Sequence, residues 1–308
     1  MEFKKWYSIE NTYRQKHIDF YLETHPELAD ETYVILEKLH GSNFQWHFMP
    51  GEPVQAGSRN RHLDVAASFQ GASIPQLMAD NAREIARFQH TADLGKCSIR
   101  LFGELIGRGI GKGVDYGEKK RILYFGMMVN EKLLPFSEFS TRIVSHHLVP
   151  VVGGECKGLE SALAFDTKFN SWVLGKPDNL CEGVVIQPRD KVYYDRYGES
   201  PFILKKKNAE FKEKEQAKKV RVVDTEVERL NAEFVSYVTD NRLQAVFSKE
   251  GEIESPKQIG SYIKLVMEDA KVDFLKDFEG DVAATSKAQQ KQIFNVSKTI
   301  AGMLKTYL

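Results

Sequence analysis

The sequence predicts an α+β protein with antiparallel sheets, followed by a separate all-helical domain. Up to about Lys207 the chain consists mainly of short strand-like runs separated by Gly, Asn, Asp and Pro. From Phe211 onward a charged segment gives way to three stretches with apolar residues at helical spacing. Short strands without regular helical crossovers favour antiparallel pairing over a βαβ alternation.

The predicted elements follow from local patterns along the chain. Strands are expected at residues 32–39, 43–48, 97–106, 121–129, 182–188, 191–195 and 201–207. A helix should interrupt them at residues 73–92, because Ser73 can cap it and Pro75 lies in its first turn. Further helices are expected at residues 226–247, 256–278 and 285–307, the second capped by Ser255. We therefore predict one domain at residues 1–222 and a helical domain at residues 223–308.

Composition limits the protein class. The 308 residues are 42% hydrophobic and 28% charged with a formal net charge of +0, so any nucleic-acid surface must come from local basic clusters. The apolar runs are too short to cross a bilayer, and the first residues resemble neither a signal nor a transit peptide. A cytoplasmic protein with no membrane partner is expected. Cys97, Cys156 and Cys181 have no CxxC spacing, so reduced thiols are expected.

Lys38 is the first candidate functional residue. It ends a predicted strand and is followed three residues later by Gly41. The same KxxG spacing recurs from Lys257 to Gly260, where it merely opens a predicted helix, so the spacing alone is a weak signal. Lys38 differs because it has an ordered set of downstream companions, each of a type that a nucleotide-transfer site needs.

Three companions could bind a nucleotide. Arg59 follows a small-residue turn, and its guanidinium fork suits a ribose or phosphate oxygen, although it could be an ordinary surface arginine. Glu104 lies on an apolar strand, where a carboxylate needs a partner; a structural ion pair is the alternative. Phe125 could stack on a purine, or it could be a core aromatic.

Three more companions could act on a phosphate. Glu182 directly precedes a predicted buried strand and could hold a divalent metal or orient a lysine. Lys205 and Lys207 are two residues apart on one strand, so they should face the same side. Two ammonium groups on one face repel each other unless an anion lies between them, which favours a phosphate site over a solvated strand end.

These motifs together resemble those of the covalent nucleotidyltransferases, the superfamily of ATP-dependent ligases and mRNA capping enzymes. The closest resemblance is to the T4-type RNA ligase 2 family, which includes the kinetoplastid RNA-editing ligases. It spans residues 3–214 and extends into the helical tail. The resemblance rests on Lys38-Leu39-His40-Gly41, Ser58-Arg59, Phe102-Gly103-Glu104, Phe125, Glu182-Gly183-Val184-Val185-Ile186 and Leu204-Lys205-Lys206-Lys207.

The resemblance implies a nucleotidyltransferase (ATP-grasp-like) fold and an RNA ligase (ATP) activity. Lys38 would attack the α-phosphorus of ATP to form a lysine–AMP adduct, and AMP would then activate an RNA 5′-phosphate for attack by a 3′-hydroxyl. We expect Lys205 and Lys207 to favour the neutral amine of Lys38 and to neutralise the phosphate. Mg²⁺ (or Mn²⁺) near Glu182 would assist. The expected partner is RNA with 3′-OH and 5′-phosphate ends, in the form of a nicked duplex, bound by a monomer.

The same resemblance assigns the nucleotide pocket. Arg59 and Glu104 would contact ribose, Phe125 would stack on adenine, and Glu37, Leu39 and Asn43 would line the pocket around Lys38. Two positions depart from the family pattern. The family often has an acidic residue after Phe125, whereas this chain has Gly126-Met127, and the middle of the last motif is Lys206, which should point to the opposite face.

Other interpretations remain open from the sequence. A DNA ligase or a capping guanylyltransferase would use the same lysine chemistry, but both normally continue into an OB-fold. A degenerate ligase that only binds RNA would be expected to lack one of the motif residues. The glycine-rich residues 107–113 lack the Lys-Ser/Thr ending of a P-loop and favour a strand connection, although Arg108 and Lys112 could contact RNA. Residues 205–221 favour a mixed-charge linker.

Overall fold

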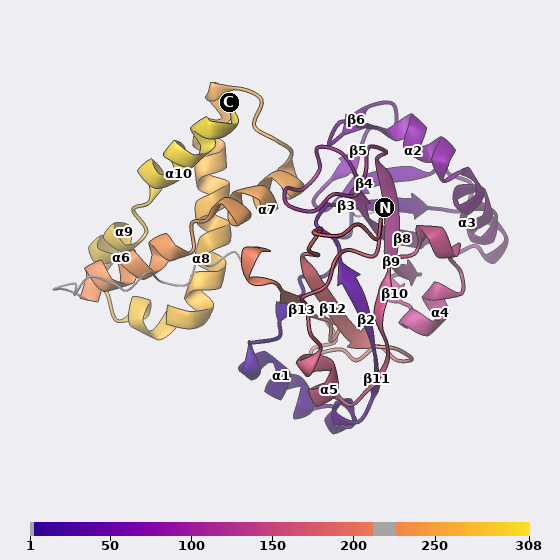
Figure 1. The fold of residues 1–308 in the computed structure, drawn as a ribbon, viewed down its shortest axis with the longest axis horizontal. Helices are drawn as coiled ribbons and strands as arrows, with labels where there is room; N and C mark the ends of the chain where they lie inside the picture. Colours follow the sequence, from indigo (N-terminus) through magenta and orange to yellow (C-terminus); the bar gives the residue numbers. More distant parts are fainter. Residues whose placement is uncertain (1–2, 212–225) are drawn as a thin grey trace. The chain divides into compact units, whose positions relative to one another are not determined.

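The structure is a computed structural model that describes residues 3–211 and 226–308. It divides into two compact units, Met1–Glu210 and Phe211–Leu308. Figure 1 shows strands concentrated in the first unit and helices in the second. The first unit thus confirms the α+β prediction and the second confirms the helical one. The predicted boundary between residues 222 and 223 and most of the predicted linker lie outside the described residues.

The first sheet carries the lysine strands. Its order is β1-β13-β12-β2-β11, so β12 lies between the other two motif strands and is antiparallel to both. β1 pairs with β13 in parallel, which the sequence did not indicate. The bounds are β1 (Glu10–Asn11), β2 (Thr32–Lys38), β11 (Val151–Lys157), β12 (Gly183–Pro188) and β13 (Leu204–Lys207).

The second sheet holds the remaining motif strands in the order β10-β9-β8-β3-β4-β5. Every residue of β3 is buried, and Phe44, Trp46 and Phe48 alternate with polar residues along it. The bounds are β3 (Ser42–Phe48), β4 (Gln55–Ser58), β5 (His62–Leu63), β8 (Ile99–Ile106), β9 (Arg121–Val129) and β10 (Lys132–Leu133), and a small pair is formed by β6 (Ser68–Phe69) and β7 (Ala72–Ser73). The strand predicted at residues 191–195 is wrong, because only an isolated bridge between Tyr194 and Pro201 forms there.

The helix predicted at residues 73–92 is two helices, α2 (Ile74–Asp80) and α3 (Ala82–Gly95). Ser73 caps the first, as expected, by accepting a hydrogen bond from Gln76 N. The break falls at Asn81, whose side chain donates to the Leu77 carbonyl and competes with helix continuation. The other helical segments of this unit are α1 (Gln15–Leu22), η1 (Pro26–Ala29), α4 (Phe136–Ser140), η2 (Ser145–His147) and α5 (Leu159–Ala164), and η3 (Ala209–Phe211) includes the boundary between Glu210 and Phe211.

Two apolar clusters lie on opposite faces of the first sheet. One joins Ile18 and Tyr21 of α1 to Val184 and Ile186 of β12. The other surrounds Trp6 and contains residues of both sheets; its members include Phe102, Phe125, Met128 and Val185. The two sheets therefore face each other across the second cluster, and the alternation of β12 assigns Val184 to one side and Val185 to the other.

The helical unit contains more, shorter helices than the sequence predicted. The stretch 226–247 is divided into α6 (Glu226–Ser236) and α7 (Asp240–Glu250), and the stretch 285–307 into α9 (Lys287–Ile293), α10 (Ser297–Leu304) and η5 (Lys305–Tyr307). Thr239 causes the first division, because it accepts a hydrogen bond from Arg242 N and begins a new helix. The middle helix is long, with η4 (Pro256–Gln258) followed by α8 (Ile259–Ala283), and Ser255 forms a capping box with Gln258.

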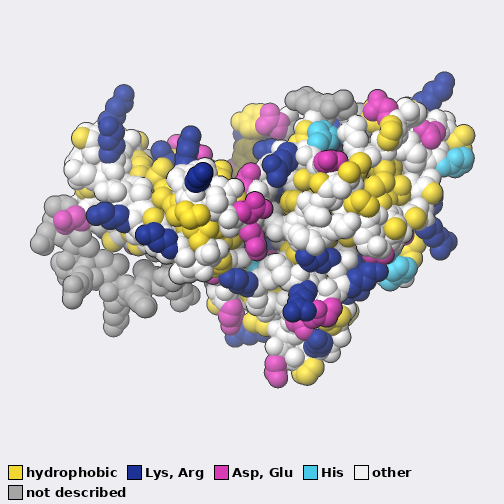
Figure 2. Space-filling model, turned by 90° about the horizontal axis from the view of Figure 1, so that it is seen from above, with side chains coloured by type: hydrophobic (Ala, Val, Ile, Leu, Met, Phe, Trp, Pro, Cys, Tyr) yellow, Lys and Arg dark blue, Asp and Glu magenta, His cyan; other side chains and the backbone are white. Residues whose placement is uncertain are grey.

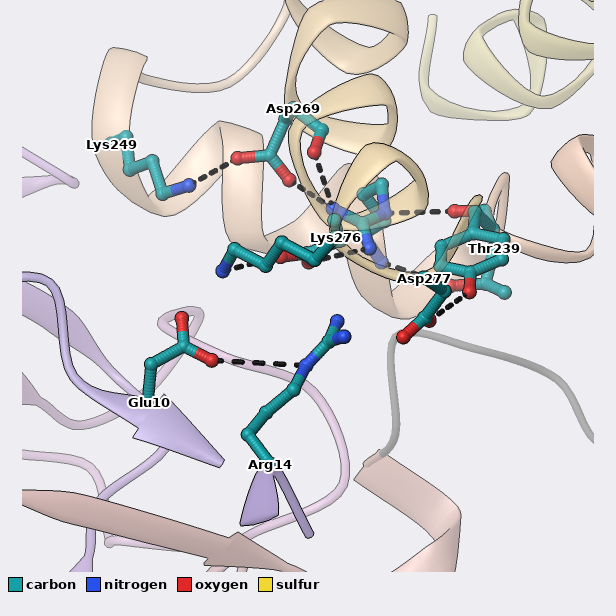
Figure 3. A network of polar contacts seen from close by, with 10 residues as sticks. Glu10, Arg14, Thr239, Lys249, Asp269, Lys276 and Asp277 are labelled. Carbon is teal, nitrogen blue, oxygen red and sulfur yellow. Dashed lines mark hydrogen bonds and ion pairs between the residues drawn. The ribbon is translucent and has the colours of Figure 1, made fainter. Parts of the chain in front are cut away.

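An ionic network connects α7 to α8 inside the helical unit. Arg242 is 1% exposed, and its guanidinium contacts Asp269 at 2.5 Å and Asp273 at 3.0 Å. Lys249 pairs with the other oxygen of Asp269 at 2.5 Å, and Figure 3 shows these two side chains pointing toward each other. A buried guanidinium requires such partners, so the network fixes how α7 lies against α8. Ile259, Ile263 and Met267, which have helical spacing in α8, pack against this unit's core, and Val266 is part of that core.

The surface shows mixed charges. On the face drawn in Figure 2, Lys and Arg side chains are interspersed with Asp and Glu, in keeping with the net charge of +0. Cys97, Cys156 and Cys181 are free thiols. Within residues 3–211 and 226–308, no helix is long and apolar enough to cross a membrane.

Candidate active site

Strand register brings the lysines of two distant motifs to one place. Gly183 of β12 lies opposite Lys38 of β2 on one side and opposite Lys207 of β13 on the other. Residues opposite each other in a sheet share a face, so the side chains of Lys38 and Lys207 lie on the same face. Lys205 lies two residues before Lys207 on β13, so its side chain lies on that face too. Lys206 points the other way, as predicted, and its Nζ donates to the carbonyls of Leu163 and Phe165 at 2.8 Å each.

Glu182 lies between the two lysines. Its Oε2 is 2.7 Å from Lys38 Nζ, and its Oε1 is 2.9 Å from Lys207 Nζ. The carboxylate is only 2% exposed. Burial disfavours its charged form, but the positive charges of Lys207 and Lys38 outweigh burial and hold the pKa of Glu182 well below its usual range. The arrangement is a lysine–carboxylate–lysine bridge on one sheet face.

His40 and Tyr116 also belong to this site, although the sequence argument gave them no role. His40 Nδ1 lies 3.4 Å from Glu182 Oε2, and His40 N donates a 2.8 Å hydrogen bond to the Tyr116 hydroxyl. Burial raises the pKa of Tyr116 well above its usual value, so the phenol stays neutral. The position of His40 inside the KxxG motif is a sequence signal that could have indicated its role. Tyr116 lies in no motif, so no sequence signal indicated its role. The glycine-rich segment before Tyr116 connects β8 to β9, and Arg108 in it pairs with Glu118 at 2.6 Å.

Glu104 and Asn43 form a second polar group next to the first. They lie directly opposite each other in the β3–β8 ladder. Gly41 N donates a 3.2 Å hydrogen bond to Glu104, which ties this carboxylate to the KxxG turn. Burial raises the pKa of Glu104 to about 7, against the opposing effect of Lys38. Asn43 Oδ1 is buried and accepts no hydrogen bond from the described residues, so it can receive a donor from a ligand.

Arg59 and Phe125 lie at the edge of the same region. Arg59 follows β4, donates to Ser8 Oγ at 3.3 Å, and its charge lowers the pKa of Glu104. Phe125 is the extra residue of a β-bulge, because Phe102 pairs with Gly126 and Gly103 with Tyr124. Its half-exposed ring meets Trp6 edge-on at 5.0 Å. Both residues are therefore only partly buried.

The departure at Gly126 has a steric cause. A Cβ at this position would lie 2.5 Å from the ring of Trp6. An acidic side chain after Phe125 does not fit unless Trp6 moves. The chain thus combines a glycine here with a tryptophan that closes the space above it.

Glu37 and Leu39 flank Lys38 and are both buried. Alternation along β2 puts Glu37 on the face opposite Lys38, where its Oε2 accepts a 2.9 Å hydrogen bond from Trp172 N. Burial raises the pKa of Glu37. The part of Glu37 and Leu39 in a nucleotide pocket stays a prediction.

The residues suit a divalent cation that is shared with a substrate. Among the described residues no group of three or more His, Cys, Asp and Glu side chains could enclose a metal ion. Mg²⁺ in phosphate-handling sites commonly uses one or two carboxylates together with substrate phosphates and water. Glu182, with Glu104 nearby, provides that donor set.

Two family models match the sequence. The RNA ligase family matches residues 31–207, and the T4 RNA ligase 2 C-terminal family matches residues 220–302. The chain therefore belongs to the RNA ligase family. The second match identifies it further as a T4 RNA ligase 2-type member, in agreement with the resemblance of its motifs.

Solved structures of a Naegleria gruberi RNA ligase are similar to this chain. A variant with AMP and Mn has 16% identity and a TM-score of 0.48, covering 68% of this chain and 56% of that chain. Another variant with ATP and Mn has 16% identity and a TM-score of 0.48, and the match covers 66% of this chain and 56% of that chain. This chain thus spans little more than half the length of the solved ligases that it matches.

Proposed function

We propose that this protein is an ATP-dependent RNA ligase that joins RNA 3′-OH and 5′-phosphate ends through a covalent lysine–AMP intermediate on Lys38. The observation that carries the proposal is the bridge of Lys38, Glu182 and Lys207 on one sheet face. An enzyme that stores AMP on a lysine needs a nucleophilic amine beside fixed positive charge, and strand register supplies both.

The first step forms a bond between Lys38 Nζ and the α-phosphorus of ATP. The bond to the bridging oxygen breaks, pyrophosphate leaves, and a phosphoramidate remains. The amine must lose a proton to solvent before or during attack. Glu182 Oε2 at 2.7 Å holds the amine in place and does not take that proton, because the pKa of Glu182 is well below its usual range. As the phosphate enters, its negative charge replaces the carboxylate as the partner of Lys207 and Lys205.

The phosphate charge that develops during attack is balanced by side chains of this chain. Lys207, 11% exposed, and Lys205 share the face of Lys38, so their ammonium groups would balance the charge of an α-phosphate bound beside Lys38. Glu182 and Glu104 would hold Mg²⁺ or Mn²⁺, which when bound supplies charge neutralisation at the phosphate oxygens.

The nucleotide itself would lie between the two sheets. Phe125 and Val185 come from opposite sheets and belong to one apolar cluster, so an adenine ring could enter between them. Glu104, Asn43 and Arg59 offer hydrogen-bonding groups for ribose at the edge of that space.

The later steps transfer AMP from Lys38 to the RNA 5′-phosphate and then release AMP when the 3′-hydroxyl attacks. In the transfer step, an oxygen of the RNA 5′-phosphate bonds to the phosphorus of AMP, and the phosphorus–nitrogen bond to Lys38 breaks. In the sealing step, the 3′-hydroxyl oxygen bonds to the phosphorus of the RNA 5′-phosphate, and the bond from that phosphorus to AMP breaks. We propose a nicked duplex as substrate, RNA repair as the role, and the helical unit as the element that engages RNA.

A DNA ligase or capping enzyme is the second candidate. Residues 226–308 form helices where those enzymes continue into an OB-fold, which favours the RNA ligase. A protein that only binds RNA is disfavoured because Lys38, Glu182 and Lys207 are all present and in contact.

Labelling with radioactive nucleotide tests the proposal. The native protein should acquire label from ATP and not from GTP, and Lys38→Ala should abolish the label. Lys257→Ala is the matched control, because Lys257 has the same KxxG spacing but is an exposed helix-start lysine. Persistence of label in Lys38→Ala would refute the assignment.

A further inference from the structure

The segment between α5 and β12, residues 166–181, which we name the Trp172 loop, has a well-fixed backbone. Trp172 N donates to Glu37 Oε2 at 2.9 Å, and Ser171 N donates to the Asn179 carbonyl at 2.8 Å. Asn179 makes two hydrogen bonds with the backbone of Asp115, at 2.7 and 2.8 Å. Buried side chains thus hold both ends of the loop to neighbouring segments.

The side chain of Trp172 is nevertheless 58% exposed. A large aromatic ring on a fixed backbone, turned toward water, is an unfavourable arrangement for folding alone. The ring borders an open hollow of about 570 Å³, which is also lined by Phe169, Asn170, Lys176 and Pro177. An aromatic face next to an amine is the combination that binds a nucleobase and its phosphate.

The Trp172 loop is connected directly to the catalytic strand. Glu37, which accepts its hydrogen bond, immediately precedes Lys38. Asp115, held by Asn179, immediately precedes Tyr116, whose hydroxyl accepts from His40 N. The loop that lines the hollow is therefore held to residues directly next to Lys38 and Tyr116, within the first unit.

Local charge around the loop indicates the class of partner. Residues 107–121, which the loop contacts, contain five Lys or Arg against two acidic residues, whereas the whole chain has a net charge of +0. Lys176 pairs with Asp115 at 2.6 Å, but both side chains are about half exposed, so a phosphate could replace this carboxylate at small cost. A basic surround favours a polyanion over a protein partner.

We propose that Trp172 stacks on the nucleobase exposed at an interrupted strand end of the RNA substrate, with Lys176 beside the adjoining phosphate. This rests on the proposed function, since it names a base-binding position for that substrate. It differs from the adenine position near Phe125, because the Trp172 loop contacts the opposite face of β2.

Tryptophan fluorescence tests the proposal without any turnover. The chain has three tryptophans, and Trp6 and Trp46 are 8% and 0% exposed, so acrylamide quenching reports chiefly on Trp172. In Lys38→Ala protein, short single-stranded RNA and a nicked RNA duplex with a 5′-phosphate should protect the quenchable component. Trp172→Phe should lose that component and keep most of the RNA affinity.

Affinity measurements complete the test. Trp172→Ala should raise the RNA dissociation constant roughly five- to hundredfold. Tyr197→Ala is the control, because Tyr197 is 72% exposed on another loop and should leave binding unchanged. The proposal is overturned if RNA leaves quenching unchanged, if Trp172→Ala binds as the native protein does, or if a hairpin-closed intact duplex protects equally. Failure of native protein to take label from ATP would instead refute the ligase chemistry and leave this binding result standing.

Discussion

Lys38 Nζ and Glu182 Oε2 lie 2.7 Å apart, although the two residues are 144 positions apart in the chain. The pairing of β2 with β12 brings them together, and Lys207 completes the bridge from β13. Lys38, the proposed nucleophile, is therefore part of an ion pair in the absence of a nucleotide.

Removing the charge of Glu182 should impair the first chemical step. Glu182→Gln keeps the shape of the side chain but leaves Lys38 and Lys207 without their shared counter-charge. We expect the rate of lysine adenylylation to fall about a hundredfold or more, measured by label transfer from ATP. The control is Glu155→Gln, whose exposed ion pair with Arg189 should contribute little. A Glu182→Gln protein that labels at the native rate would contradict the role given to the bridge.

Gly183 should tolerate no side chain. Its φ is +149°, and a Cβ would lie 2.0 Å from the Lys206 carbonyl oxygen, so β12 and β13 would have to separate. We expect Gly183→Ala to lower the free energy of unfolding by more than about 3 kcal/mol, measured by urea denaturation. Gly154→Ala in β11 is the control, because nothing lies within 4 Å and only its φ of +59° costs about 1–2 kcal/mol. Equal losses in the two variants would show that close approach is not the cause.

Stability should depend on pH through Glu104. Burial raises its pKa from 4.5 to about 7, so between these values the folded state keeps a proton that the unfolded state has lost. The protonated Glu104 therefore makes its whole contribution to the free energy of unfolding below pH 4.5. As pH rises to 7 this contribution decreases, by about 3 kcal/mol at most. Glu104→Gln cannot ionise, so its stability relative to the native protein should increase over this range. The raised pKa of Glu104 would be contradicted if the difference in free energy of unfolding between the native protein and Glu104→Gln did not change with pH.

The two units should separate functionally. Each has its own apolar core, so a chain ending after Arg221 should keep the first unit folded. We expect this protein to retain lysine adenylylation and to lose most sealing of 5′-phosphate RNA. Unchanged sealing would mean that the helical unit is not the element that engages RNA.

Much of the site could be predicted because its residues sit in ordered motifs on clear strands. Alternation along one strand predicts that Lys205 and Lys207 share a side and that Lys206 points to the other. That Lys38 lies on the same side as Lys207 depends on strand pairing and is seen only in the structure. The bridge through Glu182 could not be derived, since it depends on which strands pair and in what register. The same reason hid Tyr116, whose hydroxyl reaches His40 from a segment without regular structure.

The fold was predicted less well at positions where polar side chains interrupt a pattern. Hydrophobic periodicity continues across Asn81 and across Thr239, so each was included in one long helix. In both places a side-chain hydrogen bond ends or begins a helix, and such competition is local and energetically small. The run at residues 191–195 has strand-forming composition but finds only an isolated bridge, because strand formation requires a partner as well as propensity.

The parallel pairing of β1 with β13 has a practical consequence for dissecting the protein. Residues Glu10 and Asn11 cover the outer edge of the strand that carries Lys205 and Lys207, and Thr12 N adds a hydrogen bond to the Lys205 carbonyl. A fragment trimmed to begin at residue 31, where the family match starts, would leave that edge open to adhesion with other chains. Loss of catalysis in such a fragment would then report on an unprotected strand rather than on any missing chemical group.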